Sequence, residues 1–325
     1  MRICVLLVAS VSVLLAGPAF GQSAKVSILV DLDPARVDRS IQVESITADA
    51  SGLLYIPDAV TGNILRIDPS SPKPVVVGRI PSRAGANLQT GANGLGFDAR
   101  GDLYIAKASY GEVLRIRKDE LNPDRPGVAT TFATGTTGAN GIAFDRHGYA
   151  FVTGTATGRI YRVSPGGEVT LVAELATLET VGADGVPVRG PGPNGVAVDA
   201  SGTVHVTNTS LGEIWRIDVR PDGTVGTPAL WVKSPLLQRI DGIAFDAMGT
   251  AWLASQRNAI ITVSRNGEIR EVAANGSDGP LQVPTGIVFV GAKAYVNNYD
   301  TVPAPNGNGK TSEGGIGSSI ALIEP

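Results

Sequence analysis

The chain has 325 residues, a formal net charge of −3 and 41 glycines, and 43% of its residues are hydrophobic. A nucleic-acid-binding protein usually carries a concentrated basic surface. The sequence has no basic cluster of that kind, so we expect no nucleic-acid partner. Low charge and frequent glycine instead favour short strands joined by tight turns.

The first 21 residues have the pattern of a secretory signal peptide. Met1-Arg2 precedes an apolar run over residues 3–15, which is too short to span a bilayer comfortably, and small residues follow. We expect cleavage near Gly21–Gln22, export to the periplasm or the medium, and no membrane attachment afterwards. An uncleaved anchor helix is the alternative. The single cysteine, Cys4, lies in this segment, so the mature chain would have no disulfide.

A short phrase recurs six times along the rest of the chain, and its clearest copies read like Asn194-Gly-Val-Ala-Val-Asp-Ala-Ser-Gly. The copies are spaced 49, 47, 54, 47 and 44 residues apart, close to the period of propeller repeats. Their first residues are Glu44, Asn93, Asn140, Asn194, Asp241 and Thr285. We call these six the ring residues, because the repeat makes them equivalent positions of one symmetric object.

Each repeat predicts four short strands. In residues 194–233, an apolar run, an Asp/Gly turn and an alternating run form a hairpin pattern, and two further alternating runs follow. Four antiparallel strands make one propeller blade. We therefore predict an all-β fold in which residues 22–325 form a single six-bladed β-propeller. The run Val26–Asp31 resembles a fourth strand without a blade, and we expect it to close the last blade.

The ring residues predict a metal site at one mouth of the central channel. The innermost strand of each blade lines the channel, and oxygen-bearing side chains that converge there suit Ca²⁺ or Mg²⁺. Glu44 and Asp241 would repel each other unless a cation lay between them, and Asn140 and Asn194 would supply carbonyl oxygens. The alternative is that Asn-Gly only forms turns. The aspartates in the middle of the copies are expected to be turn residues: Asp49, Asp98, Asp145, Asp199 and Asp246.

Two long insertions, 175–193 and 299–317, are expected on the same face as the ring, where they would form a pocket with a partial lid. The second strands end on this face. We therefore expect substrate contacts from Lys107, Asn208 and Asn298, together with Asn93 of the ring; solvated loop tips are the simpler interpretation. His147 is expected in an exposed hairpin turn, and His205 is expected to be packed inside a strand. Few histidines and no mature cysteine disfavour zinc and copper.

With these residues the chain resembles the senescence marker protein/gluconolactonase/luciferin-regenerating enzyme-like (SGL) family of six-bladed propellers. The matching residues are Glu44 in the first copy, Asn140 and Asn194 in the third and fourth, and Asp241 in the fifth. The resemblance implies that these four bind one divalent cation. Calcium is the usual choice in the family, and Mg²⁺, Mn²⁺ or Zn²⁺ also serve.

The resemblance also implies hydrolysis of a lactone, with Asp241 as metal ligand and general base. Sugar-lactone members often have an arginine and an acid where this chain has Gly138 and Gly141. A less polar lactone or ester therefore fits as well as a sugar lactone. A non-catalytic periplasmic binding propeller is the competing interpretation. A lyase that acts on a cyclic ester is a third, but it would need a histidine near the metal. We expect a monomer that acts on a small molecule.

Overall fold

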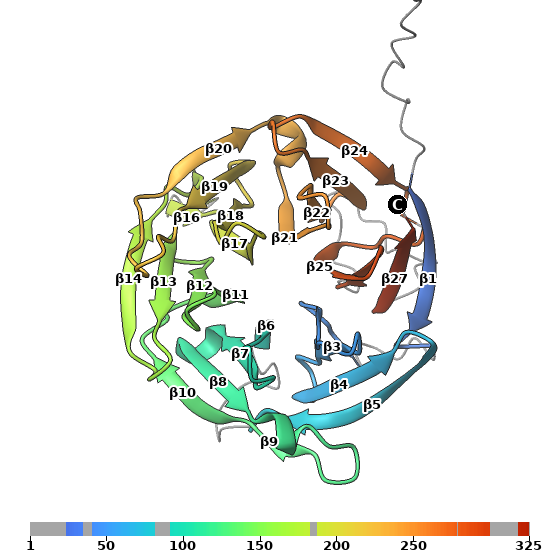
Figure 1. Cartoon of the computed structure of the whole chain (residues 1–325). Helices are drawn as coiled ribbons and strands as arrows, with labels where there is room; N and C mark the ends of the chain where they lie inside the picture. The colour runs from blue at the N-terminus through green and yellow to red at the C-terminus, as the bar shows by residue number, and fades with distance from the viewer. Residues whose placement is uncertain are drawn as a thin grey trace, which may run out of the picture.

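The computed structural model describes residues 24–34, 41–81, 92–182, 187–277, 279–299 and 318–324. The expected signal peptide lies outside these residues, and so does almost all of the loop 299–317. The described chain forms six four-stranded antiparallel blades around a central channel (Figure 1). The expected all-β, six-bladed propeller is confirmed.

The blades follow each other along the chain, and each runs from the channel outward. We number them by the ring residue that they carry. Blade 1 contains β2 (Thr47–Ala48), β3 (Leu54–Pro57), β4 (Asn63–Asp68) and β5 (Ser71–Arg79). Blade 2 contains β6 (Ala92–Phe97), β7 (Leu103–Lys107), β8 (Glu112–Ile116) and β10 (Thr130–Thr134). Blade 3 contains β11 (Ala139–Phe144), β12 (Ala150–Gly154), β13 (Arg159–Val163) and β14 (Val169–Glu174).

The second half of the ring repeats this plan. Blade 4 contains β17 (Pro193–Val198), β18 (Val204–Asn208), β19 (Glu213–Ile217) and β20 (Ala229–Lys233). Blade 5 contains β21 (Ile240–Phe245), β22 (Ala251–Ser255), β23 (Ala259–Val263) and β24 (Ile269–Ala274). Blade 6 contains β25 (Pro284–Val290), β26 (Lys293–Asn298), β27 (Ser319–Glu324) and β1 (Lys25–Asp31).

The two ends of the described chain meet in blade 6. Strand β1 pairs antiparallel with β27, from Lys25 opposite Glu324 to Asp31 opposite Ser319 (Figure 1). The predicted closure by the N-terminal strand is therefore confirmed. It covers the backbone edge of β27, which would otherwise be open to pairing with another chain.

Two sheet elements were not predicted. Strand β9 (Gly127–Val128) adds to the outer edge of blade 1 in parallel with β5. Strands β15 (Glu179–Val181) and β16 (Pro187–Arg189) form a separate hairpin inside the insertion 175–193. Within the described ranges, the helical segments are the 3₁₀ turns η1 (Ala108–Tyr110), η2 (Lys118–Glu120) and η3 (Pro235–Leu237), and no helix there could cross a membrane.

Apolar side chains fill the seams between neighbouring blades. One such cluster joins Ile64 of blade 1 to Leu103 and Ile105 of blade 2, and all three side chains are fully buried. In another of these clusters, Tyr104 and Phe132 meet edge to face with ring centroids 5.0 Å apart. Burial of this apolar surface holds the blades in a rigid ring and so fixes the positions of the residues around the channel.

The aspartates of the repeats close the first hairpin of blades 1 to 5, as expected. In blade 4, Asp199 Oδ1 accepts hydrogen bonds from the backbone nitrogens of Ser201 and Thr203 at 2.9 and 3.0 Å. The other four make the same pair of bonds. These aspartates are therefore bound to their own turns.

Candidate functional site

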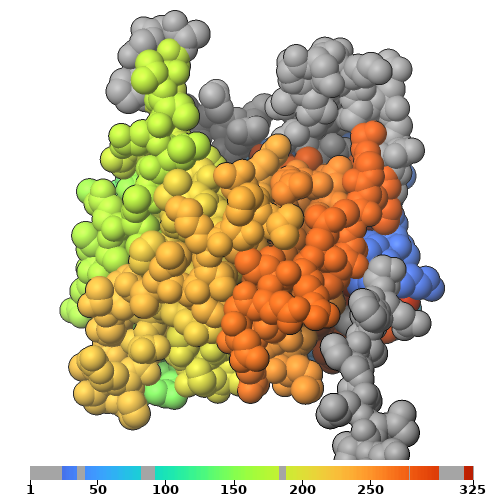
Figure 2. Space-filling view, turned by 90° about the horizontal axis from the view of Figure 1, so that it is seen from above, coloured from blue at the N-terminus to red at the C-terminus, as the bar shows by residue number. Residues whose placement is uncertain are grey.

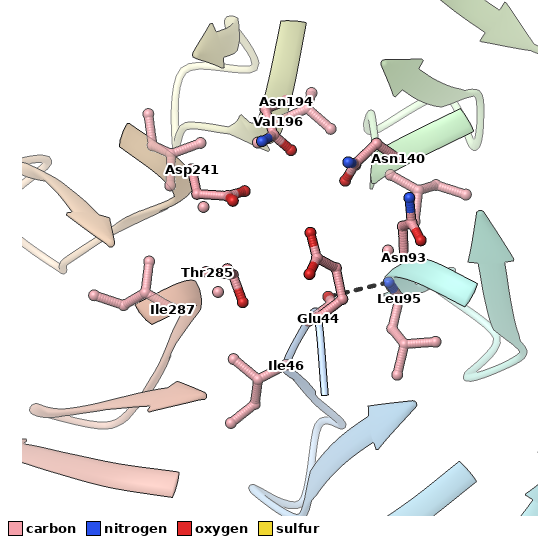
Figure 3. Close-up of a pocket in the computed structure, with 18 residues that line it drawn as sticks. Glu44, Ile46, Asn93, Leu95, Asn140, Asn194, Val196, Asp241, Thr285 and Ile287 are labelled. Carbon is pink, nitrogen blue, oxygen red and sulfur yellow. Dashed lines mark hydrogen bonds between the residues drawn. The ribbon is translucent and has the colours of Figure 1, made fainter. Parts of the chain in front are cut away.

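All six ring residues converge on a cavity of about 80 Å³ at one mouth of the channel (Figure 3). The carboxylates of Glu44 and Asp241 and the amides of Asn140 and Asn194 point toward its centre. Besides the six ring residues, Ser45 is the polar residue among those that line it. The structure therefore brings together the predicted metal ligands and one of the four predicted substrate-binding residues, Asn93.

The glycine that follows five of the six ring residues lets neighbouring blades approach closely. A Cβ atom at Gly195 would overlap the backbone oxygen of Asp241 in the next blade, and one at Gly141 would overlap the backbone oxygen of Asn194. Neither glycine has a positive φ, and both lie inside strands. The Asn-Gly pairs therefore serve close packing around the axis, and the turn interpretation is wrong for them.

The first blade departs from this rule, because serine follows its ring residue. The hydroxyl of Ser45 accepts a hydrogen bond from the backbone nitrogen of Leu95 at 3.3 Å (Figure 3). This bond ties the segment before β2 to blade 2. Glu44 is thereby placed at the channel, and its carboxylate points toward the middle of the ring.

Asp241 is held from two sides. Its side-chain oxygen Oδ2 accepts a hydrogen bond from Gln256 Nε2 at 2.8 Å, and its backbone oxygen accepts one from Thr207 Oγ1 at 2.8 Å. Burial raises the pKa of Asp241 to about 7, while the amides of Gln256 and Asn194 act in the opposite direction. Burial and the charge of Asp241 also raise the pKa of Glu44 well above its ordinary value. Both carboxylates thus lie where a negative charge lacks a counterion.

Asn194 presents an oxygen that the protein leaves unbonded. Its Nδ2 donates a hydrogen bond to Thr209 Oγ1 at 3.1 Å, and the residue is only 3% exposed. Its Oδ1 is buried and has no hydrogen-bond partner among the described residues. A buried polar atom of this kind needs a partner that the protein itself does not supply, such as a water molecule or an ion. An amide oxygen beside two carboxylates is a donor set that suits a hard divalent cation.

The ring residues include no histidine or cysteine, so they offer a metal oxygen atoms and no imidazole nitrogen or thiolate sulfur. The described residues contain no group of three or more histidine, cysteine, aspartate and glutamate side chains that could hold a metal ion. A metal in this ring would therefore depend on amide oxygens as well as on Glu44 and Asp241. Such oxygen-only ligation favours Ca²⁺ or Mg²⁺ over zinc.

The other three predicted substrate-binding residues do not line the cavity. Lys107 is buried, with its Nζ 4.7 Å from the ring centroid of Tyr110. Asn208 Nδ2 donates to the backbone oxygen of Ala176 at 2.8 Å. Asn298 Nδ2 donates to Pro280 O and to Ser319 Oγ, each at 2.9 Å. At least the two asparagines anchor connections between strands. The substrate role of all three residues stays a prediction.

Sequence reasoning missed the residues that support the ring. Thr209 and Gln256 follow directly after Asn208 and Ser255, the ends of β18 and β22. They hold Asn194 and Asp241 of the same blades. In both blades the sequence signal was a polar residue one position after the end of the second strand.

Neither histidine belongs to the ring. His205 is buried, and its Nε2 lies 2.9 Å from Asp199 Oδ2. The backbone nitrogen of His147 donates to Asp145 Oδ1 in the turn of blade 3. These placements agree with the expectation that His205 is a packed residue and His147 a turn residue, and the ring itself has no imidazole.

The hairpin β15–β16 lies in the connection that enters β17 next to Asn194. It is tied to blade 4 by a hydrogen bond from Leu178 N to Ser210 Oγ at 3.3 Å, and it stands out from the body of the propeller as the lime-green column in Figure 2. Val181 is 72% exposed there. The hairpin therefore projects beside the mouth of the channel at which the ring lies. A lid that also includes residues 299–317 stays a prediction.

Comparisons with known proteins agree with this architecture. The sequence description of the SMP-30/gluconolactonase/LRE-like region matches residues 189–296, and that of a β-propeller repeat matches residues 131–162. The first match confirms the resemblance to the SGL family and includes Asn194 and Asp241. A search of curated proteins gave no match.

Solved structures share the fold at low sequence identity. A calcium-binding protein, regucalcin, from Agrobacterium tumefaciens superposes with a TM-score of 0.64 at 16% identity, covering 91% of this chain and 94% of the other. A gluconolactonase from Xanthomonas campestris gives 0.62 at 16% identity, with 93% and 89% covered. Virginiamycin B lyase from Staphylococcus aureus gives 0.58 at 15% identity, with 93% and 99% covered. These likenesses establish the six-bladed architecture.

Proposed function

We propose that the protein is a metal-dependent hydrolase that opens a lactone at the ring of six residues. The observation that carries the proposal is the unbonded Asn194 Oδ1, which lies in the same small cavity as Glu44 and Asp241. The resemblance to the SGL family and the gluconolactonase fold support the reaction class.

Glu44, Asn140, Asn194 and Asp241 would hold one divalent cation, with calcium the best match to their oxygen atoms. A bound cation would polarise the lactone carbonyl and stabilise the oxyanion that forms when water attacks. Asp241 would accept the proton of that water, and Gln256 would keep its carboxylate turned toward the ring. Asn93 would contact the substrate. The product is a single hydroxy acid, which carries a carboxylate at one end of the opened ring and a hydroxyl at the other.

The substrate we favour is a lactone with few hydroxyl groups. An added Cβ at Gly141 would overlap the backbone oxygen of Asn194, and Gly138 has a φ of +76°. The packing of blades 3 and 4 therefore excludes a larger side chain at Gly141 and strains one at Gly138. The polar contacts that a sugar lactone would need from these positions are missing.

The lyase alternative has less support. A lyase acting on a cyclic ester would need a base such as histidine near the metal. The chain has two histidines, and neither lines the ring cavity. A non-catalytic binding propeller uses the same ring as a structural metal site, and only turnover separates it from the hydrolase. We also propose that the protein is exported after cleavage near Gly21 and acts as a monomer.

The deciding experiment is a lactone panel with and without chelator. Purified protein is analysed for metal, stripped with EDTA and reconstituted separately with Ca²⁺, Mg²⁺, Mn²⁺ and Zn²⁺. Each form is assayed on gluconolactone, an aliphatic lactone and dihydrocoumarin. The proposal predicts turnover that disappears with chelator and returns with calcium, and that is faster on the less polar lactones. Bound metal without turnover on any lactone or ester would favour the binding propeller.

A further inference from the structure

A second cavity, of about 340 Å³, lies between blades 4 and 5 at the opposite end of the strands from the ring. Strand β17 begins beside Asn194 of the ring and ends directly before Asp199, which lines this second cavity. Its other main lining side chains are His205, Arg216, Trp231, Phe245 and Arg265. The volume is within the range of small-molecule sites.

Arg216 is the unusual residue of this cavity. Its guanidinium lies 3.9 Å from the centre of the Trp231 ring. Its Nε is buried and has no hydrogen-bond partner among the described residues. The equivalent arginine of blade 3, Arg162, instead donates to Asp145 Oδ2 at 2.9 Å and to the backbone oxygen of Gly223 at 2.8 Å. Within the described part of the chain, Arg162 Nε is also buried without a partner, so the two arginines differ in the outer nitrogens of the guanidinium, which are hydrogen-bonded in Arg162 of blade 3.

The cavity exists because a side chain that bridges two blades is missing. In the turn of blade 3, Arg146 reaches into blade 4 and donates to the backbone oxygens of Ser201 and Val219. The same turn position in blade 4 is Ala200, which lines the cavity. The seam between blades 3 and 4 is closed by arginines, and the seam between blades 4 and 5 is left open.

The acidic residues nearby limit what the cavity can accept. Asp199 is already bonded to His205 and to its own turn, and Asp218 is exposed at the edge. Burial lowers the pKa of Arg216, and the charges of both aspartates act against this. A ligand with several negative charges would be repelled by these aspartates, whereas a single carboxylate could pair with the guanidinium of Arg216.

We propose that the cavity between blades 4 and 5 binds a small organic monocarboxylate with a flat apolar body. The carboxylate pairs with the guanidinium of Arg216, and the body packs against Trp231 and Phe245. Charge-assisted bonds of this kind are among the stronger ones in proteins, and aromatic walls favour planar ligands. This site is separate from the ring and does not depend on its chemistry.

Benzoate is the probe for this site, and it is titrated by calorimetry into the full mature protein in the presence of EDTA, so that a metal in the ring cannot contribute. Benzamide, which is neutral, tests whether the ligand needs a negative charge. Citrate, which carries several carboxylates, tests whether the cavity rejects ligands with more than one. We expect benzoate to bind one to one with a Kd of about 1 mM or tighter. Benzamide and citrate should bind at least about tenfold more weakly.

Two variants locate the binding. Arg216→Met should weaken benzoate binding at least about tenfold, whereas Arg115→Met, the equivalent position of blade 2, should leave it unchanged. Ala200→Arg gives blade 4 the bridging arginine that blade 3 has at this position, and it should block the cavity without removing Arg216. Circular dichroism melts confirm that each variant folds. The proposal is overturned if benzoate does not bind, if benzamide binds equally well, or if Ala200→Arg leaves the affinity unchanged.

Discussion

Gln256 Nε2 donates a hydrogen bond to Asp241 Oδ2 at 2.8 Å, and this bond joins a residue outside the ring to the acid that we place at the centre of the chemistry. The bond fixes the carboxylate and partly offsets the rise in its pKa that burial causes. Residues of this kind orient a metal ligand without touching the metal.

Gln256→Ala should therefore weaken calcium binding by about 10- to 100-fold while the protein stays folded. The carboxylate of Asp241 would be free to turn, and its pKa would rise further. Calcium affinity measured by calorimetry checks this prediction, with the exposed Gln238→Ala as the matched control. Equal affinity in both variants would show that Gln256 does not position Asp241.

Asp241→Asn separates the two roles proposed for this residue. If Asp241 is the base, the variant keeps its metal and loses about 10²- to 10⁴-fold in kcat. If Asp241 is mainly a ligand, the metal is lost together with the activity. Metal content and kcat are measured on the same preparation. Full activity with full metal content would exclude Asp241 from both roles.

The pH dependence of stability has a defined sign at this site. Burial raises the folded-state pKa of Asp241 from 3.8 to about 7, so between these values the folded protein holds a proton that the unfolded chain releases. Its contribution to the stability of the metal-free protein is complete below about pH 4 and is lost as the pH rises toward 7. Burial lowers the pKa of His205, which acts in the opposite sense below pH 6.5.

Because of His205, the prediction concerns the difference between wild type and Asp241→Asn. In EDTA, the variant should melt a few degrees higher than wild type at pH 8, and this advantage should shrink as the pH falls to 5. Calcium should raise the melting temperature of the wild type at pH 8 by binding to the folded state. A difference in melting temperature that does not change with pH would contradict a raised pKa for Asp241.

Gly195 is predicted to be intolerant of even one extra carbon. A Cβ there would lie 2.9 Å from Gly242 Cα and would overlap the backbone oxygen of Asp241. Gly195→Ala should destabilise the protein by about 1–3 kcal/mol and weaken metal binding by displacing Asp241. Gly166→Ala, where the nearest atom would be 3.6 Å away, is the control. If both variants melt alike, the close approach of blades 4 and 5 is not what requires the glycine.

The closing strand can be tested by truncation. A chain that starts at Leu32 lacks β1 and exposes the edge of β27, so it should melt lower and self-associate. A chain that starts at Ala24 keeps β1 and should behave as the mature protein. Size-exclusion chromatography and thermal melts distinguish the two. Equal behaviour would mean that β1 contributes little to closure.

The sequence predicted the fold well because each blade repeats the same local signals. An Asp/Gly turn between alternating runs defines a hairpin without reference to the rest of the chain, and the unpaired run 26–31 indicated the closure. The parallel strand β9 was not predicted, because its two residues lie between two strands of blade 2 but pair with β5 of blade 1.

The site was predicted only in part, for a similar reason. The ring residues share one register, so their convergence on the axis follows from the repeat alone. The roles of Thr209 and Gln256 depend on side-chain geometry across neighbouring strands, which a periodic pattern does not contain. The open seam at Ala200 could not be predicted either, because it depends on the contacts that Arg146 makes across the preceding seam.

The most direct test of the central claim is the calcium content of the purified protein after equilibrium dialysis, compared with that of the double variant Glu44→Gln/Asp241→Asn. We predict one tightly held calcium ion per wild-type chain and none in the double variant, whose blades should still be folded. A wild-type protein that retains no ion at millimolar calcium, or a double variant that retains it equally well, would contradict a metal centre at this ring.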